Sequence, residues 1–260
     1  MPMLIKFFYF SLLWSSVHHK TLPADTIIKK IRIQFEYSSS IFPESWQEPP
    51  VNAWGDTISA SEITRSKTIM IKALNKYPDA VLTENLNTVY FLKKMKYFGV
   101  PYGGTNSYNA VYIANDGTGS GYSDLYIEQT FHHEFSSILF RKYAAFLNTD
   151  DWKSANLSGF DYNDPENGVG SIRKNESSQD IDTFFCKQGF LTQYALSSME
   201  NDINTIAQNL FSPSQGFWRI VNDYPLIEKK VKLLIAFYNK ISPLFTEVYF
   251  RNFRFYAYPK

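Results

Sequence analysis

The residues of this 260-residue chain that are best suited to chemistry lie in one short segment, residues 131–139, with the sequence FHHEFSSIL. A helix that carries His-Glu-x-x-His presents two imidazoles one turn apart to a metal ion, and the glutamate beside the first histidine activates a metal-bound water. Here His133 and Glu134 supply the first half of that pattern, whereas Ser137 occupies the position of the second histidine. Starting the pattern at His132 does not restore it, because the residue four positions later is again a serine.

Histidine and cysteine are scarce enough to limit where any metal could bind. The four histidines form two adjacent pairs, His18-His19 and His132-His133, so an imidazole site in the folded domain must use the second pair. Adjacent side chains project about 100° apart on a helix, which disfavours both histidines of that pair as ligands of one ion. The single cysteine, Cys186, excludes an intrachain disulfide and a cysteine-based zinc ribbon. The His-His-Glu run also suits the polar face of a helix that binds nothing.

Hydrophobic periodicity places this segment on a helix and indicates an α+β fold. The strands gather in the first half of the chain, where they form a mixed sheet against the helix of residues 124–146, and the second half is mainly helical. Residues 148–179 are polar and contain glycine and proline, which predicts a long irregular excursion. Helices are expected at residues 59–76, 124–146, 200–211 and 226–241, and strands at residues 26–37, 81–100, 110–114 and 245–258.

Composition and charge exclude several classes of protein. Hydrophobic residues make up 44% and charged residues 20% of the chain, which excludes a wholly disordered protein. The 26 basic and 25 acidic residues give a net charge of +1, so no basic excess supports binding to nucleic acid. Aromatic residues reach 17%, enough to fill much of a core with rings. Beyond the N-terminus, no stretch free of charges is long enough to cross a membrane.

The N-terminus predicts an export signal over residues 1–20. Lys6 precedes an apolar run, FFYFSLLW, and two small residues follow it, which is the order found in secretory signals. A secreted, periplasmic or cell-envelope location follows, with the segment either cleaved or kept as an anchor. Val17 stands where a bacterial lipoprotein has its cysteine, so lipidation by that route is not expected. The alternative is a terminal strand or helix packed on the domain.

Several further segments occur in an order that resembles a known family. The chain is similar to the zinc-binding metallopeptidase lipoproteins of Bacteroidetes, which are often encoded with glycan or nutrient import systems. The resemblance covers about residues 70–210 and implies one zincin-like metallopeptidase domain over residues 25–260. It rests on Lys76-Tyr77-Pro78, Gly103-Gly104-Thr105, the His-Glu helix, Trp152 through Asn156 to Gly159-Phe160, Gly189-Phe190 to Tyr194-Ala195, and Glu200-Asn201-Asp202.

This resemblance implies a zinc cofactor and a role for each matching residue. His133 becomes a zinc ligand and Glu134 the general base. Glu200 becomes the downstream carboxylate ligand, with Asp202 as the alternative if the register differs. Tyr194 either stabilises an oxyanion or only packs. Glu200 taken alone also suits the first turn of a helix, where the helix dipole favours a carboxylate.

Ser137 departs from the family pattern, and two functions follow from that departure. One is an extracytoplasmic zinc-dependent hydrolase that acts on peptides or proteins with an altered ligand set, which His132 or Asp202 completes. The other is a non-catalytic relative that keeps the fold for binding or scaffolding beside an outer-membrane nutrient import system. The sequence specifies neither the substrate nor the oligomeric state.

Overall fold

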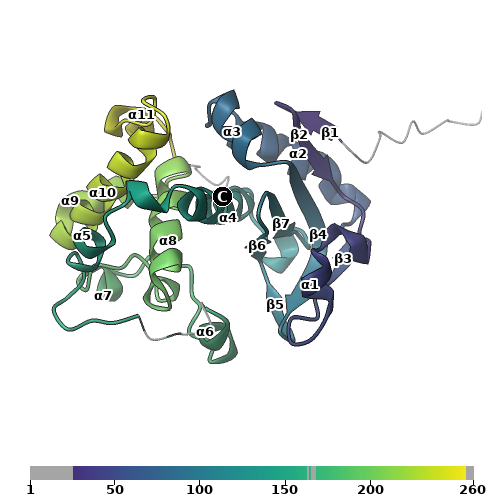
Figure 1. Ribbon diagram of the computed structural model, residues 1–260, viewed down its shortest axis with the longest axis horizontal. Coiled ribbons are helices and arrows are strands. Elements are labelled where there is room, and N and C mark those ends of the chain that lie inside the picture. Colours follow the sequence, from purple (N-terminus) through teal and green to yellow (C-terminus); the bar gives the residue numbers. More distant parts are fainter. Residues whose placement is uncertain (1–25, 163, 165–167, 256–260) are drawn as a thin grey trace, which may run out of the picture.

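The computed structural model of the chain describes residues 26–162, 164 and 168–255, so the predicted export segment lies outside the described residues. The architecture is α+β, as predicted, with a mixed sheet in the first half of the chain and helices in the second (Figure 1). None of the described helices is both long and apolar enough to span a membrane.

The sheet is organised around its longest strand, β4. β2 and β7 lie on either side of β4 and run parallel to it, and β6 is the edge strand, antiparallel to β7. β1 continues the sheet beyond β2, while β3 and β5 pair with the second half of β4. The strands span Thr26–Ile28 (β1), Ile31–Gln34 (β2), Trp54–Thr57 (β3), Thr88–Tyr97 (β4), Val100–Tyr102 (β5), Gly104–Asn106 (β6) and Ala110–Ala114 (β7).

Side chains of the central strands alternate between two hydrophobic clusters, because successive residues of a strand point to opposite faces of the sheet. On one face, Val89 and Phe91 pack in the main core together with α2 and α4. On the other face, Leu92 and Tyr112 pack in a smaller cluster with Phe42. Both faces of the sheet are therefore covered, and α4 is fixed against the face of the main core.

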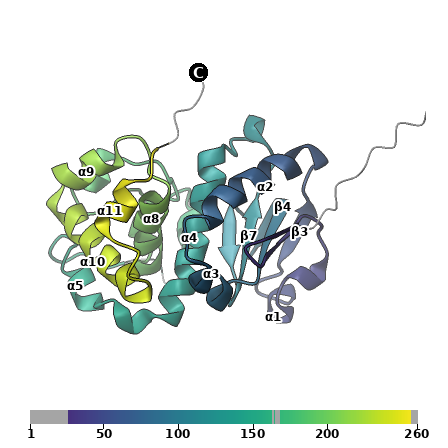
Figure 2. The same ribbon diagram turned by 90° about the horizontal axis from the view of Figure 1, so that it is seen from above.

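Helix α4 (Asp124–Lys142) lies between the sheet and the helical half of the chain (Figure 2). It contacts α2, β6 and β7 on one side and α8 on the other. The remaining helices span Glu44–Gln47 (α1), Ala60–Leu74 (α2), Asp79–Asn85 (α3), Thr149–Lys153 (α5), Val169–Arg173 (α6), Thr183–Cys186 (α7), Met199–Phe211 (α8), Phe217–Asp223 (α9), Pro225–Ile241 (α10) and Glu247–Arg251 (α11).

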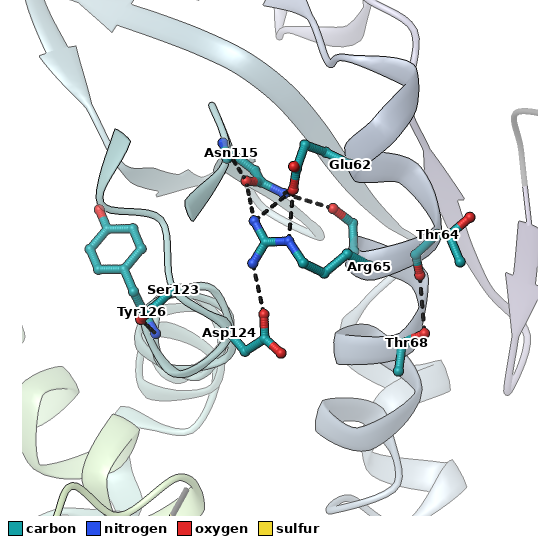
Figure 3. A network of polar contacts seen from close by, with 10 residues as sticks. Glu62, Thr64, Arg65, Thr68, Asn115, Ser123, Asp124 and Tyr126 are labelled. Carbon is teal, nitrogen blue, oxygen red and sulfur yellow. Dashed lines mark hydrogen bonds and ion pairs between the residues drawn. The ribbon is translucent and has the colours of Figure 1, made fainter. Parts of the chain in front are cut away.

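A polar network at Arg65 of α2 fixes the N-terminal end of α4 (Figure 3). The guanidinium donates to Asp124 in the first turn of α4 at 2.7 Å, to Asn115 at 2.8 Å and to Glu62 at 2.7 Å. Ser123 is the N-cap, since its hydroxyl accepts from the Tyr126 backbone N–H. The glycine-rich loop before α4 is thus held between α2 and α4, and the position of the helix does not depend on the loop alone.

Four segments differ from their predicted structure. Residues 148–179, predicted to be irregular, contain the short helices α5 and α6. Residues 26–37 form a hairpin of β1 and β2 rather than one strand, because Lys29 and Lys30 adopt positive φ angles. Residues 79–85 form α3, which follows Pro78, and not the start of a strand. Residues 247–251 of the tail form α11, which buries Phe250 in the core instead of extending a sheet.

Candidate functional site

A cleft of about 270 Å³ lies along α4, between the edge of the sheet and the helical half of the chain. Strands β5 and β6 line one side, and α8 and the segment around Tyr194 line the other. Four of the residues singled out in the sequence meet in this cleft, namely His133, Glu134, Tyr194 and Glu200.

Two glycines allow β6 to lie directly against α4. A Cβ at Gly104 would stand 2.5 Å from Thr130 Cγ2 and 2.7 Å from Glu134 Oε1. A Cβ at Gly103 would collide with the hydroxyl of Tyr126. A side chain at either position would require the strand or these α4 side chains to shift, so the glycines permit the close approach of the sheet edge to Glu134.

His133 is held by α8 through one ring nitrogen. Its Nδ1 lies 2.9 Å from Gln208 Oε1. Because an amide oxygen only accepts, Nδ1 is the donor, which leaves Nε2 as the acceptor nitrogen when the ring is neutral. The Tyr194 ring stacks near His133 with 6.3 Å between ring centroids, and burial raises the pKa of the Tyr194 hydroxyl. Both side chains are therefore positioned by packing and hydrogen bonding within the cleft wall.

Glu134 is a buried acid whose hydrogen-bond partner is a neutral amide. It is only 9% exposed, and its Oε2 accepts a 2.6 Å hydrogen bond from Asn106 Nδ2 of β6. Among the described residues no Lys or Arg forms an ion pair with it. Burial raises the pKa of Glu134, against the opposing effects of His133 and Asn106. Buried carboxylates are usually paired with a cation, and this one has only a neutral amide as its partner.

Asn106 connects Glu134 to a second acid at the cleft. Its Oδ1 accepts a hydrogen bond from Arg141 Nη2, and Arg141 Nη1 lies 3.3 Å from Glu200 Oε1. The polar chain Glu134–Asn106–Arg141–Glu200 thus runs from the floor of the cleft to its rim. It joins β6, α4 and α8 and fixes the edge strand relative to both helices.

Ser137 faces α8 and not a vacant ligand position. Its Oγ accepts a 2.6 Å hydrogen bond from Asn204 Nδ2, and both residues are buried. Asn201 and Gln208 of the same helix also line the cleft. Residues 201, 204 and 208 recur at helical spacing, so the face of α8 turned toward α4 carries amides. Sequence reasoning missed this amide stripe, although its spacing was the signal that could have revealed it.

The other two candidate ligands lie elsewhere. His132 is fully buried on another face of α4, where its Nδ1 lies 2.9 Å from Tyr77 Oη and its Nε2 lies 3.7 Å from Glu128. Asp202 is buried on another side of α8, 2.7 Å from Lys230 Nζ and 3.0 Å from Trp152 Nε1. The structure does not bring His132 and Asp202 to the cleft.

These residues do not fit a tightly held zinc ion. Structural and catalytic zinc sites converge at least three histidine, cysteine or carboxylate ligands on one point. No group of three such residues that could hold a metal ion occurs among the described residues. Ser137, which accepts a hydrogen bond from Asn204 of α8, stands one helical turn from His133, where a second imidazole would be needed. The cleft therefore offers hydrogen-bonding amides and hydroxyls beside one imidazole and two carboxylates.

Comparison of the chain with known protein families, with curated proteins and with solved structures found no match to any of them.

Proposed function

We propose that this protein is a zincin-like, non-catalytic relative of the metallopeptidases that binds an extended polypeptide along β6. The observation that carries the proposal is an edge strand with outward-facing peptide groups that lines a polar cleft. The zincin-like part of the proposal is supported by the mixed sheet, its antiparallel edge strand and the adjacent helix with His133 and Glu134.

The pairing of β6 with β7 determines which peptide groups face outward. Ala114 N–H donates to Gly103 O at 2.8 Å, and Ser107 N–H donates to Ala110 O at 2.9 Å. Antiparallel pairs alternate between hydrogen-bonded and non-hydrogen-bonded positions. Gly104 and Asn106 lie at the non-hydrogen-bonded positions between these pairs. Their backbone N–H and C=O groups therefore point away from β7. An incoming strand would bond to these two residues.

Extended peptides bind to exposed sheet edges by adding a strand, with main-chain hydrogen bonds supplying affinity. An unprotected edge is also a risk for aggregation, and proteins usually cover or blunt it. β6 is short, and α4 and α8 flank it across the cleft, which limits access to a single chain. These features favour recognition of one extended segment over sheet-to-sheet association.

Zinc-dependent hydrolysis is the second candidate. The observation in its favour is that His133, Glu134 and Glu200 line the same cleft. Against it, Ser137 bonds to Asn204 and Glu200 is ion-paired with Arg141. A zinc ion would have to displace these partners and would still lack a third strong ligand. Stoichiometric zinc in the purified wild-type protein, together with peptide cleavage abolished in Glu134→Gln, would favour this candidate.

The proposed function is tested by a backbone N-methyl scan. A fluorescent pentapeptide with acetylated and amidated ends is first selected from a random library by its binding to the protein. Each of its backbone N–H groups is then methylated in turn, and affinity is measured by fluorescence anisotropy.

Strand addition predicts that methylation at alternate residues weakens binding at least about tenfold, since each methyl group removes one hydrogen bond and adds a clash. Methylation at the intervening residues is the built-in control and should have little effect. Failure to select any peptide, or losses without alternation, would contradict strand addition.

A further inference from the structure

Apart from the imidazole of His133, the charged groups among the described lining residues of the cleft are acidic. Glu134 and Glu200 are the carboxylates, and none of the described lining residues is lysine or arginine. The nearest guanidinium, Arg141, is engaged by Glu200, Ser107 and Asn106. Glu134 is more than nine-tenths buried and has no cationic partner among the described residues. A ligand that enters this cleft therefore meets a carboxyl group that forms no ion pair with a described lysine or arginine, although His133 and Arg141 act on it from a distance.

Three tyrosines line the same cleft as this carboxylate. Tyr102 and Tyr126 lie on the side of the sheet edge, and Tyr194 lies on the opposite wall. The face of an aromatic ring attracts a cation, and the attraction grows when the cation is removed from water. Burial raises the pKa of Tyr126 to about 12, so its hydroxyl stays neutral at ordinary pH and adds no charge of its own.

The position of Glu134 relative to β6 aligns it with a bound strand. Its Oε1 lies 2.7 Å from the point where a Cβ of Gly104 would stand, and its Oε2 accepts a hydrogen bond from the Asn106 side chain. Gly104 and Asn106 are also the residues whose peptide groups point outward. A peptide bonded to them would pass within reach of the carboxylate.

We infer that the cleft selects a cationic nitrogen of the bound peptide, which pairs with Glu134 between the tyrosine rings. This inference rests on the proposed function, because a strand added to β6 is what presents the cation. The nitrogen belongs either to a lysine or arginine side chain within the peptide or to its free N-terminal ammonium. Both sources share the same chemistry, a positive N–H donor, and Glu134 serves as the specificity determinant.

The test uses the full protein and four matched peptide libraries. Three consist of acetylated and amidated pentapeptides with a fixed central lysine, norleucine or glutamate, and the fourth has a norleucine centre with a free N-terminus. Lysine and norleucine share a straight aliphatic chain, so their comparison isolates the charge. Lysine-centred peptides are expected to bind at least about tenfold more tightly than norleucine-centred ones, which is the effect of one charged hydrogen bond. Glutamate-centred peptides should bind most weakly. If instead only the free N-terminus gains affinity, the ammonium is the source of the cation.

Glu134→Gln keeps the shape of the side chain and should abolish this preference while peptides of all libraries still bind. Thermal unfolding of the variant checks that it is folded, and the wild-type ranking of the four libraries tests the inference without any variant. Equal binding of the lysine, norleucine, glutamate and free-amine libraries to the wild type would overturn the cation inference and leave strand addition standing. Binding of no library would instead remove the proposed function itself, so the two failures are distinguishable.

Discussion

Two glutamates of α4, Glu128 and Glu134, are both buried but have different partners. Glu128 is fully buried and lies against Lys76 Nζ, which also donates to Phe211 O at 2.6 Å and Ser212 Oγ at 2.9 Å. Glu134 is nearly as buried, but among the described residues it is hydrogen-bonded to the amide of Asn106 and to no lysine or arginine. Burial raises the pKa of Glu134, whereas the hydrogen bonds and charges of His132 and Lys76 outweigh burial and lower that of Glu128 to about 2.

The adjacent histidines, His132 and His133, also lie in different environments. His132 lies in the core beside Tyr77 and Glu128, and His133 lies in the cleft beside Gln208. A rotation of about 100° between adjacent residues of a helix sends them to different environments. One face of α4 therefore carries an acid that pairs with a lysine of the chain, while the cleft face carries a carboxyl group that forms no ion pair with a described lysine or arginine.

The largest expected effect is on the paired face. Glu128→Gln leaves the ammonium of Lys76 buried without its counter-charge and should lower the free energy of unfolding by about 3–5 kcal/mol. Urea denaturation followed by circular dichroism measures the loss. A change below about 1 kcal/mol would mean that the ion pair does not hold the segment after α2 against α4, and that Glu128 and Glu134 do not differ in their contribution to stability.

Acidification should act through His132. Burial lowers its pKa from 6.5 to about 4 in the folded protein. Since the unfolded chain takes up the proton first, this contribution to stability is complete above about pH 6.5 and is lost as the pH falls toward 4, by up to about 3 kcal/mol. Urea unfolding at pH 7 and pH 4.5 measures the slope. In His132→Gln the difference between the two pH values should shrink, and an unchanged slope would assign the acid sensitivity to other groups.

Ser137→His tests how closely the cleft approaches a zinc site. The new imidazole stands one turn from His133 on the same helix face, and Glu200 lines the same cleft. Zinc affinity measured by competition with a chelator should rise at least about tenfold over the wild type, and Glu200→Gln in the same background should reverse the gain. Ser137→Ala is the control, since it breaks the bond to Asn204 without adding a ligand. No gain in Ser137→His would argue against a zincin-like placement of α4 and α8.

The smallest effect is expected on the cleft face. Glu134→Gln can keep the hydrogen bond from Asn106 and removes a buried charge that has no cation, so its stability should change by less than about 1 kcal/mol or increase. Urea denaturation measures the free energy of unfolding of Glu134→Gln, and Glu128→Gln is the matched comparison. A loss as large as that of Glu128→Gln would show that the Glu134 carboxylate supports the fold, and the contrast between the two faces would disappear.

Local patterns in the sequence were sufficient for the long helices. The predicted helix over residues 59–76 corresponds to α2, that over 124–146 to α4 and the short 3-10 turn after it, and those over 200–211 and 226–241 to α8 and α10. Apolar residues recur at helical spacing in these segments, and Pro78 follows the end of α2. The turn between β1 and β2 escaped prediction because lysine rarely adopts positive φ, and α11 because its aromatic run favours strands in isolation.

The sequence alone also determined that His133 and Glu134 share a helix and that Ser137 interrupts the metal-binding pattern. Only the tertiary structure decided what surrounds them. Partners of these side chains come from distant segments, since Asn106 lies 28 residues before Glu134 and Gln208 lies 75 residues after His133. Spacing along a chain fixes the direction in which a side chain leaves its helix, but burial and pairing depend on which element packs there. That is why the same pattern of residues could not tell Glu128 from Glu134 until β6, α2 and α8 were in place.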